Sequence, residues 1–391
     1  MALDRSRPRG LRVQVEEGLR DAIRSGRLPP GERLPSSRAL AADLGVTRGV
    51  VVDAYDQLAA EGYVTTVQGS GTRVNDVGAA GPARTGAGPV PAPALTHDFR
   101  SGLPDLALFP RAAWARATRA ALAAMPDADL GYLPPAGLPA VRASIAAYLG
   151  RVRGVACEPA QVVMCNGFGH GFSLVLRALF DRGRTGVAVE VPGYDDPRDQ
   201  IHAAGGRAHP VPVDEQGIRT DALAALPAAT VGAVVVTPAH QSPTGVVLSA
   251  RRRTELADWA RATGAYVIED DYDAEYRYDR QPVGALQGVA PDRVIYHGTL
   301  SKSLAPGLRL GWLVVPPDLL DDVLRARLLT DHMGTSIVQA TFGEFLERGD
   351  LDRHLRRTRR IYRQRRDAVV DALARWLPGT SVGGVSAGLT A

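Results

Sequence analysis

The residue best suited to covalent chemistry is Lys302, because it is the only lysine among 391 residues. Lysine and arginine together total 46, so every other basic side chain is an arginine. Arginine stays protonated in proteins, whereas a lysine amine can lose its proton and attack a carbonyl carbon. A chain that keeps a single lysine therefore points to amine chemistry at that position, of the kind that forms Schiff bases.

The residues around Lys302 indicate which carbonyl compound it meets. Three hydroxyl side chains and one arginine lie in a polar turn between two apolar runs: Thr299, Ser301, Ser303 and Arg309. Hydroxyls and guanidinium groups donate hydrogen bonds to phosphate oxygens. An aldehyde that carries a phosphate is pyridoxal 5'-phosphate (PLP). The segment VIYHGTLSKSLAPGLRLGWLVV resembles the lysine loop of the fold-type I PLP enzymes, the aspartate aminotransferase superfamily.

That resemblance implies a PLP site with Lys302 as the Schiff-base residue. Asp270 follows an apolar run, and the resemblance implies that its carboxylate pairs with the ring nitrogen, which strengthens the ring as an electron sink. It also implies Tyr272 near the ring hydroxyl and Tyr194 stacked on the ring. The phosphate contacts it implies are Thr299, Ser301 and Arg309, together with a glycine turn that opens a helix at Gly167, Phe168 and Gly169.

One residue departs from the family pattern, and two carboxylates near Asp270 have no role in that pattern. Ser242 stands where aminotransferases usually carry the asparagine that binds the ring hydroxyl, and His240 or Gln241 are the candidates to replace it. Asp271 and Asp273 are expected to be solvated carboxylates in an acidic loop.

Residues 131–155 resemble the segment that offers a tyrosine to the phosphate of the neighbouring subunit. Here that residue is Tyr132, so the resemblance implies a homodimer.

The first 75 residues have the pattern of a winged helix-turn-helix. Apolar residues at helical spacing predict a first helix, Ser36 or Ser37 can cap a second, and Thr47 can cap a third before a hairpin. Residues 11–74 resemble the DNA-binding domain of the GntR family. The predicted DNA contacts are Thr47 and Arg48 in the major groove, with Arg38, Gly69, Ser70, Gly71 and Arg73 at the backbone or minor groove.

Composition divides the chain into three regions: a DNA-binding domain at 1–75, a Pro/Gly/Ala-rich linker at 76–95 and a PLP-binding domain at 96–391. Alternating apolar strands and helices in the third region predict an α/β fold with a mostly parallel sheet. The sequence ends at GTSVGGVSAGLTA, so the small C-terminal domain of this fold is expected to be incomplete. The arginine-rich stretch 353–366 is expected to be a solvated helix, with a second nucleic-acid patch as the alternative.

The whole pattern resembles the MocR subgroup of GntR regulators. It predicts a cytoplasmic, PLP-binding regulator that binds duplex operator DNA, with an amine or amino acid as a further effector and no efficient enzymatic activity. The alternatives are an active PLP-dependent aminotransferase that carries a DNA-binding domain, and a repressor whose enzyme domain has decayed. The net charge of +4 is compatible with DNA binding. We find no signal peptide, no membrane-spanning run and no metal motif.

Overall fold

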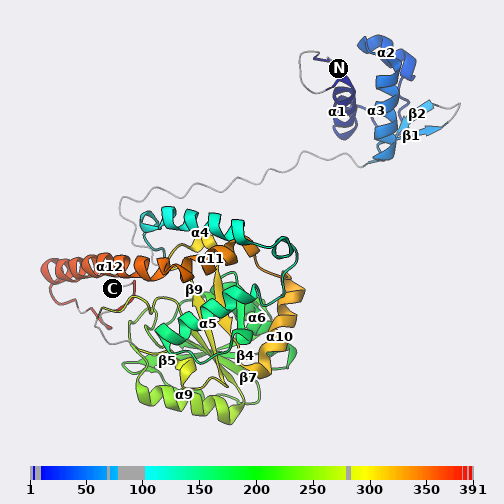
Figure 1. The fold of residues 1–391 in the computed structure, drawn as a ribbon. Helices are drawn as coiled ribbons and strands as arrows, with labels where there is room; N and C mark the ends of the chain where they lie inside the picture. Colours follow the sequence, from blue (N-terminus) through cyan, green and yellow to red (C-terminus); the bar gives the residue numbers. More distant parts are fainter. Residues whose placement is uncertain are drawn as a thin grey trace. The chain divides into compact units, whose positions relative to one another are not determined.

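The computed structural model describes residues 3–4, 10–67, 71–77, 102–278, 283–380, 382–384 and 387–389. The chain divides into two compact units, Met1–His97 and Asp98–Ala391, and each is described here by itself (Figure 1). The predicted linker lies outside the described residues from position 78 onward.

The first unit contains three helices and a hairpin: α1 (Leu11–Arg24), α2 (Ser37–Leu44), α3 (Arg48–Ala60), and the antiparallel strands β1 (Val64–Val67) and β2 (Gly71–Val74). Helix α2 begins after Ser36, whose hydroxyl accepts a hydrogen bond from the Ala39 backbone N–H at 3.2 Å. It ends at Gly45 in the left-handed conformation, which glycine adopts without steric cost. Buried side chains from all three helices form one core, so the predicted winged helix-turn-helix is confirmed.

The second unit is built on an eight-stranded sheet with the order β3-β10-β9-β8-β7-β4-β5-β6. Strands β5, β4, β7, β8 and β9 are parallel, whereas β10 and β6 run antiparallel to their neighbours. The strands are β3 (Val162–Cys165), β4 (Gly186–Val191), β5 (Arg207–Asp214), β6 (Gly217–Ile218), β7 (Val231–Val236), β8 (Tyr266–Asp271), β9 (Val294–Thr299) and β10 (Gly311–Val314). The predicted mostly parallel α/β sheet is confirmed.

Helices cover both faces of this sheet (Figure 1). They are α4 (Arg111–Ala124), α5 (Pro139–Arg153), α6 (Phe168–Asp181), α7 (Asp196–Ala203), α8 (Thr220–Ala224), α9 (Ala250–Thr263), α10 (Pro317–Thr330), α11 (Ser336–Glu347) and α12 (Asp350–Trp376). Within the described residues, no helix is both long and apolar enough to cross a membrane.

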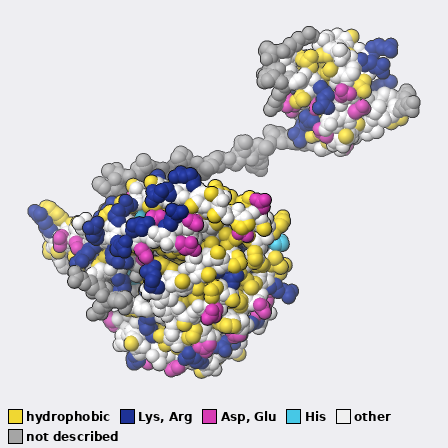
Figure 2. All heavy atoms as spheres, in the orientation of Figure 1, with side chains coloured by type: hydrophobic (Ala, Val, Ile, Leu, Met, Phe, Trp, Pro, Cys, Tyr) yellow, Lys and Arg dark blue, Asp and Glu magenta, His cyan; other side chains and the backbone are white. Residues whose placement is uncertain are grey.

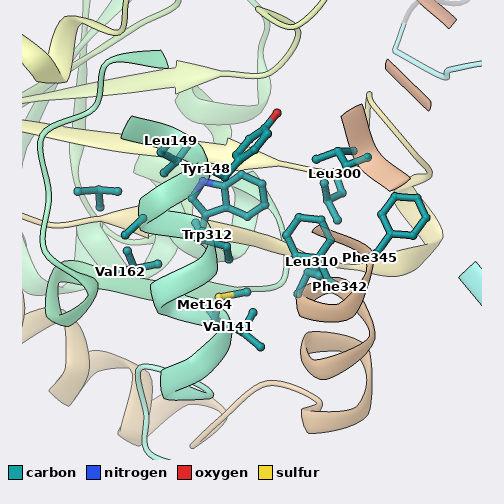
Figure 3. Close-up of a cluster of buried hydrophobic side chains, with 14 of the residues drawn as sticks. Val141, Tyr148, Leu149, Val162, Met164, Leu300, Leu310, Trp312, Phe342 and Phe345 are labelled. Atoms are coloured by element: carbon teal, nitrogen blue, oxygen red, sulfur yellow. The ribbon is translucent and has the colours of Figure 1, made fainter. Parts of the chain in front are cut away.

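Successive side chains of a strand point to opposite faces of the sheet, so they pack in different hydrophobic cores. On β9, Ile295 packs with side chains of α6 and α10, while Tyr296 packs with side chains of α5, α11 and α12. Figure 3 shows the second cluster, where Trp312 of β10 stacks on Phe342 of α11 with ring centroids 5.6 Å apart. These two cores fix the height and direction of the strands whose ends carry the candidate site.

Candidate functional site

The predicted cofactor residues gather at one edge of the sheet, beyond the carboxyl ends of its strands. Asp270 lies at the end of β8, Thr299 ends β9, and Tyr194 and Gly167 follow β4 and β3. In open α/β sheets this edge is where ligands bind, because the connecting loops leave a crevice there.

Asp270 is buried, and only one of its two carboxylate oxygens accepts a hydrogen bond from the described residues. Its Oδ2 atom accepts a hydrogen bond from the Tyr194 hydroxyl at 2.6 Å. Burial is the main cause that raises the pKa of Tyr194, so this hydroxyl remains a donor at neutral pH. The other oxygen, Oδ1, is buried without a hydrogen-bond partner among the described residues. Such an orphaned acceptor costs free energy unless another donor reaches it.

His297 stands behind Asp270 on β9 and was missed by the sequence interpretation. Its Nδ1 lies 3.5 Å from Asp270 Oδ1, an ion-pair distance that is too long for a strong hydrogen bond. Burial lowers the pKa of His297, but the contacts with Asp270 and Cys165 outweigh it and raise this pKa to about 9. A histidine inside an otherwise apolar strand is the signal that could have identified it, because buried charges are rare unless they are paired.

Phe168 packs against both neighbours of that carboxylate. Its ring meets Tyr194 edge-on at 5.8 Å and His297 edge-on at 5.0 Å between centroids. The side chain therefore packs between Tyr194 and His297, while its backbone opens helix α6.

The predicted phosphate contacts converge at the N-terminus of α6. Gly167 precedes the helix with φ 88°, and no side chain caps it. A Cβ added at Gly167 would lie 3.7 to 3.9 Å from three donor side chains: Arg309, Ser301 and Thr299. Free backbone N–H groups, two hydroxyls and a guanidinium thus surround one small space, which suits a phosphate. We call this group the cradle.

Two further observations concern the cradle. Arg309 has φ 49°, a left-handed backbone that costs a non-glycine residue about 1–3 kcal/mol and is concentrated at functional sites. A Cβ added at Gly169 would lie 3.4 Å from the side-chain nitrogen of Gln200, so this glutamine of α7 is a neighbour that sequence reasoning missed.

Lys302 lies in the turn after β9 and is partly exposed. Its Nζ donates a hydrogen bond to the backbone carbonyl of Gly102 at 2.5 Å. Gly102 has φ 96°, and a Cβ there would come within 3.3 Å of the amine. The segment that precedes α4 therefore closes over the lysine through its backbone.

The expectation of solvated carboxylates beside Asp270 is wrong. Asp271 is buried and forms an ion pair with Arg153 at 2.7 Å, and Asp273 is buried against His240 Nδ1 at 3.0 Å. Successive strand residues point to opposite faces, so Asp271 turns away from Asp270 into the layer of α5. The acidic stretch is not all loop, because Glu269, Asp270 and Asp271 all belong to β8.

The two candidates for the missing asparagine are both engaged elsewhere. His240 lies beside Asp273, and its backbone carbonyl accepts a hydrogen bond from the Tyr272 hydroxyl at 3.0 Å. The amide nitrogen of Gln241 donates to the Pro192 carbonyl at 2.9 Å. Tyr272 therefore lies in the predicted neighbourhood, with its hydroxyl directed to the backbone of residue 240.

Within the described parts of the chain, no hydrogen bond or ring contact joins Tyr132 to these residues, and 93% of its surface is exposed. Its ring is 6.4 Å from that of His332, a second non-glycine residue with positive φ, at 59°. Leu130, Leu328 and Leu329 are likewise exposed.

The predicted DNA contacts occupy the surface of the first unit. Arg38 of α2 and Thr47 and Arg48 at the start of α3 are exposed. Thr47 occupies the N-cap position, although its side chain makes no cap hydrogen bond. In the hairpin, Arg73 is exposed and also donates to the Gly31 carbonyl at 2.9 Å.

Of the three residues predicted at the hairpin tip, only Gly71 is described, because Gly69 and Ser70 lie outside the described residues. A Cβ on Gly71 would meet the Arg33 guanidinium at 2.8 Å, so Arg33 is a further basic residue of this surface.

Comparisons with known proteins agree with both units. Residues 98–390 match the model of the aminotransferase class I and II family, and residues 11–74 match the bacterial regulatory proteins of the gntR family. Among solved structures, an archaeal alanine:glyoxylate aminotransferase superposes with a TM-score of 0.66 at 29% identity, covering 72% of this chain and 71% of that one. The alpha-aminoadipate aminotransferase of Thermus thermophilus, complexed with N-(5'-phosphopyridoxyl)-L-leucine, gives 0.63 at 27% identity and 74% of each chain. The chain belongs to the aminotransferase class I and II family.

Two related regulators indicate which kind of protein this chain is within the family. The pyridoxine biosynthesis transcriptional regulator PdxR of Corynebacterium glutamicum is 38% identical over 100% of this chain and 84% of its own length. The probable rhizopine catabolism regulatory protein MocR of Rhizobium meliloti is 35% identical over 96% of this chain and 80% of its own. Within its family the chain is a MocR-type transcriptional regulator of the GntR group, and the regulator interpretation is favoured over an active enzyme.

Proposed function

We propose that this chain is a PLP-responsive transcription regulator that acts in the cytoplasm. Residues 1–75 bind operator DNA, residues 76–95 link the domains, and residues 96–391 hold PLP as a sensor. PLP, alone or joined to an amine or amino acid, changes operator affinity. An effector does this only if it binds one state of the protein more tightly than the other.

The observation that carries the proposal is the buried Oδ1 of Asp270, which has no hydrogen-bond donor among the described residues. A protonated pyridine nitrogen is a donor of the right charge for this atom. The cradle supplies phosphate donors at the same sheet edge, with Gly167 leaving the room that a Cβ would fill. Lys302 supplies the amine. The residues present therefore suit PLP at its nitrogen and its phosphate, and Lys302 is the one lysine that could react with its aldehyde.

PLP bound there supplies an aldehyde that reacts with amines and a ring that accepts electrons. The chain's own residues do the rest. Asp270 holds a proton at the ring nitrogen, Tyr194 and His297 hold Asp270, and the cradle orients the phosphate.

We further propose that two copies of the chain associate through the second unit. Tyr132 is almost fully exposed, and Leu130 and Leu329 are exposed with it. Exposed apolar side chains of this size favour burial at an interface. In a symmetric dimer Tyr132 of each copy reaches the cradle of the other.

Retardation of promoter DNA by the full chain tests the regulator proposal. We expect binding that weakens when Arg48→Ala removes a base contact, by about 1–3 kcal/mol. We expect PLP to shift the affinity of the unaltered protein and to leave that of Lys302→Ala unchanged. Arg12→Ala on α1 is the matched control, because Arg12 pairs with Glu16 and is not among the predicted DNA contacts. Failure to retard DNA at low salt contradicts the proposal.

An active aminotransferase is the second candidate, because the 2-aminoadipate transaminase of Thermus thermophilus is 30% identical over 72% of this chain. A half-reaction with excess amino donor separates the two. Conversion of PLP to pyridoxamine phosphate at the rate of a working transaminase favours the enzyme.

A further inference from the structure

A cavity of about 390 Å³ lies in the second unit, away from the cofactor residues. It is bounded by the C-terminal end of α5, the first turns of α12 and residues 274–277 after β8. Its floor includes Arg153, whose partner Asp271 is adjacent in sequence to Asp270 but points to the opposite side of the sheet. The cavity and the cofactor residues therefore use opposite faces of one strand. Its volume is within the range of small-molecule pockets.

The lining of this cavity is strongly basic. Five arginines and two carboxylates contribute to it. One of those arginines, Arg151, is compensated by Asp352 at 2.9 Å. Arg359 donates to the backbone carbonyl of Glu275 at 3.0 and 2.6 Å, a contact that leaves its charge uncompensated. The cavity therefore presents more positive charge than its own acids neutralise.

Two donors in the lining lack partners. Arg356 is exposed at the rim and makes no hydrogen bond or ion pair within the part of the chain that the structure describes, so its guanidinium is free to meet a ligand. Arg153 is 5% exposed, and its Nη2 is buried without an acceptor there. A buried guanidinium donor is costly to leave unpaired, so a nearby acceptor stabilises the site. The second carboxylate carries less than a full negative charge at neutral pH, because burial raises the pKa of Glu275 to about 7.

The walls add a feature that suits an organic ligand. Tyr148 lines the cavity, and Figure 3 shows its hydroxyl pointing out of the hydrophobic cluster that holds its ring. The guanidinium of Arg151 lies 5.7 Å from the centre of that ring. An aromatic edge, a hydroxyl and several guanidinium groups recognise a small molecule with an acidic group. Figure 2 shows basic side chains gathered over α12, where an anion would approach.

We propose that this cavity is a second ligand site, which binds a small organic anion bearing carboxylate or phosphate groups. Arg356 and Arg359 contact the acidic group, and Tyr148 contacts the body of the ligand. The site is separate from the cradle and does not depend on PLP.

Isothermal titration calorimetry on the full chain tests this, with citrate and inorganic pyrophosphate as separate probes at constant ionic strength. We expect saturable binding of at least one probe. Arg356→Gln should weaken it about tenfold, because a charge-assisted hydrogen bond is lost. Arg356→Lys should restore part of the affinity. Because Arg356 is exposed and has no hydrogen bond or ion pair among the described residues, we expect both variants to fold.

Two matched variants keep the test decisive. Arg363→Gln changes the same helix outside the cavity, where Arg363 faces Asp367. An equal loss in that variant means diffuse attraction to a basic helix and overturns the proposal. Arg309→Gln disables the cradle, so loss of binding there means that the anion occupies the cofactor site, which also overturns it. If neither probe gives a saturable heat of binding, the proposal is also overturned. Citrate binding alone identifies a carboxylate site, and pyrophosphate binding alone identifies a phosphate site.

Discussion

At the scale of single residues, the candidate site is organised around one carboxylate. Asp270 is approached by Tyr194 at 2.6 Å and by His297 at 3.5 Å, and Phe168 packs on both of these neighbours. Tyr194 fixes Oδ2, and His297 lies at ion-pair distance from Oδ1 without a hydrogen bond to it, so Oδ1 can still accept one.

Replacing Asp270 tests its proposed role directly. Asp270→Asn keeps the size of the side chain but removes the charge that holds a proton on the ring nitrogen. We expect PLP affinity to fall at least about tenfold, the effect of losing about 1.4 kcal/mol. Titration with PLP followed by absorbance measures this. Asp371→Asn on α12 is the control, and equal affinity in Asp270→Asn would contradict the assignment.

The stability of the second unit should depend on His297. Its pKa is raised to about 9 in the folded state, so its contribution is complete below about pH 6.5 and is lost as pH rises through 9. The loss is on the order of 3 kcal/mol. Burial raises the pKa of Glu190 and Glu269 to about 7, and their contributions are lost earlier, between about pH 4.5 and 7.

Urea unfolding at about pH 7 and about pH 9 measures this prediction. All four tryptophans lie after residue 98, so tryptophan fluorescence reports the second unit alone. His297→Gln should abolish most of the fall in stability between these two pH values. An unchanged fall in the variant would assign the effect to another group.

At the scale of elements, strand ends and helix starts create the site. The apolar runs of the sequence predicted β8 and β9 and thereby placed Asp270 and Thr299, because buried parallel strands are continuous hydrophobic segments. The glycine turn at Gly167 predicted the start of α6, because a turn of this kind ends a strand and opens a helix. Sequence could not predict that His240 turns to Asp273, since that pairing joins residues 33 apart through tertiary packing.

Gly167 gives an element-scale prediction. Its φ of 88° is unfavourable for any side chain, and a Cβ would enter the cradle. Gly167→Ala should destabilise the protein by about 1–3 kcal/mol and also abolish PLP binding. Gly183→Ala is the matched control, because φ there is 78° and nothing lies within 4 Å of its Cβ. The control should lose stability and keep PLP, whereas PLP binding by Gly167→Ala would argue against the cradle.

At the scale of the whole molecule, a DNA-binding unit and an aminotransferase-like unit share one chain. The N-terminal unit holds 11 arginines and 9 acidic residues up to position 75, so its net charge is small. Its DNA-binding surface must therefore come from the way the arginines are arranged. The order of the two units was predictable, because each has its own motifs. The partner of Tyr132 was not, since a single chain carries no direct information about its neighbour.

Dimerisation is the prediction at this scale. Sedimentation of the PLP-loaded protein should show a dimer. Tyr132→Phe should remain dimeric and bind PLP more weakly, because only the hydroxyl that reaches the partner's cradle is lost. A monomer at all concentrations would contradict the arrangement, and unchanged PLP affinity in Tyr132→Phe would contradict the role of the hydroxyl.

The solitary lysine has a practical consequence. Lys302 carries the only side-chain amine of the protein, and its Nζ is held by the Gly102 carbonyl. Reagents that modify amines can therefore label one side chain and the N-terminus only. Protection of that single side-chain label by a ligand counts occupied sites molecule by molecule in a purified sample, because the other 45 Lys or Arg side chains are arginines, which such reagents leave unmodified.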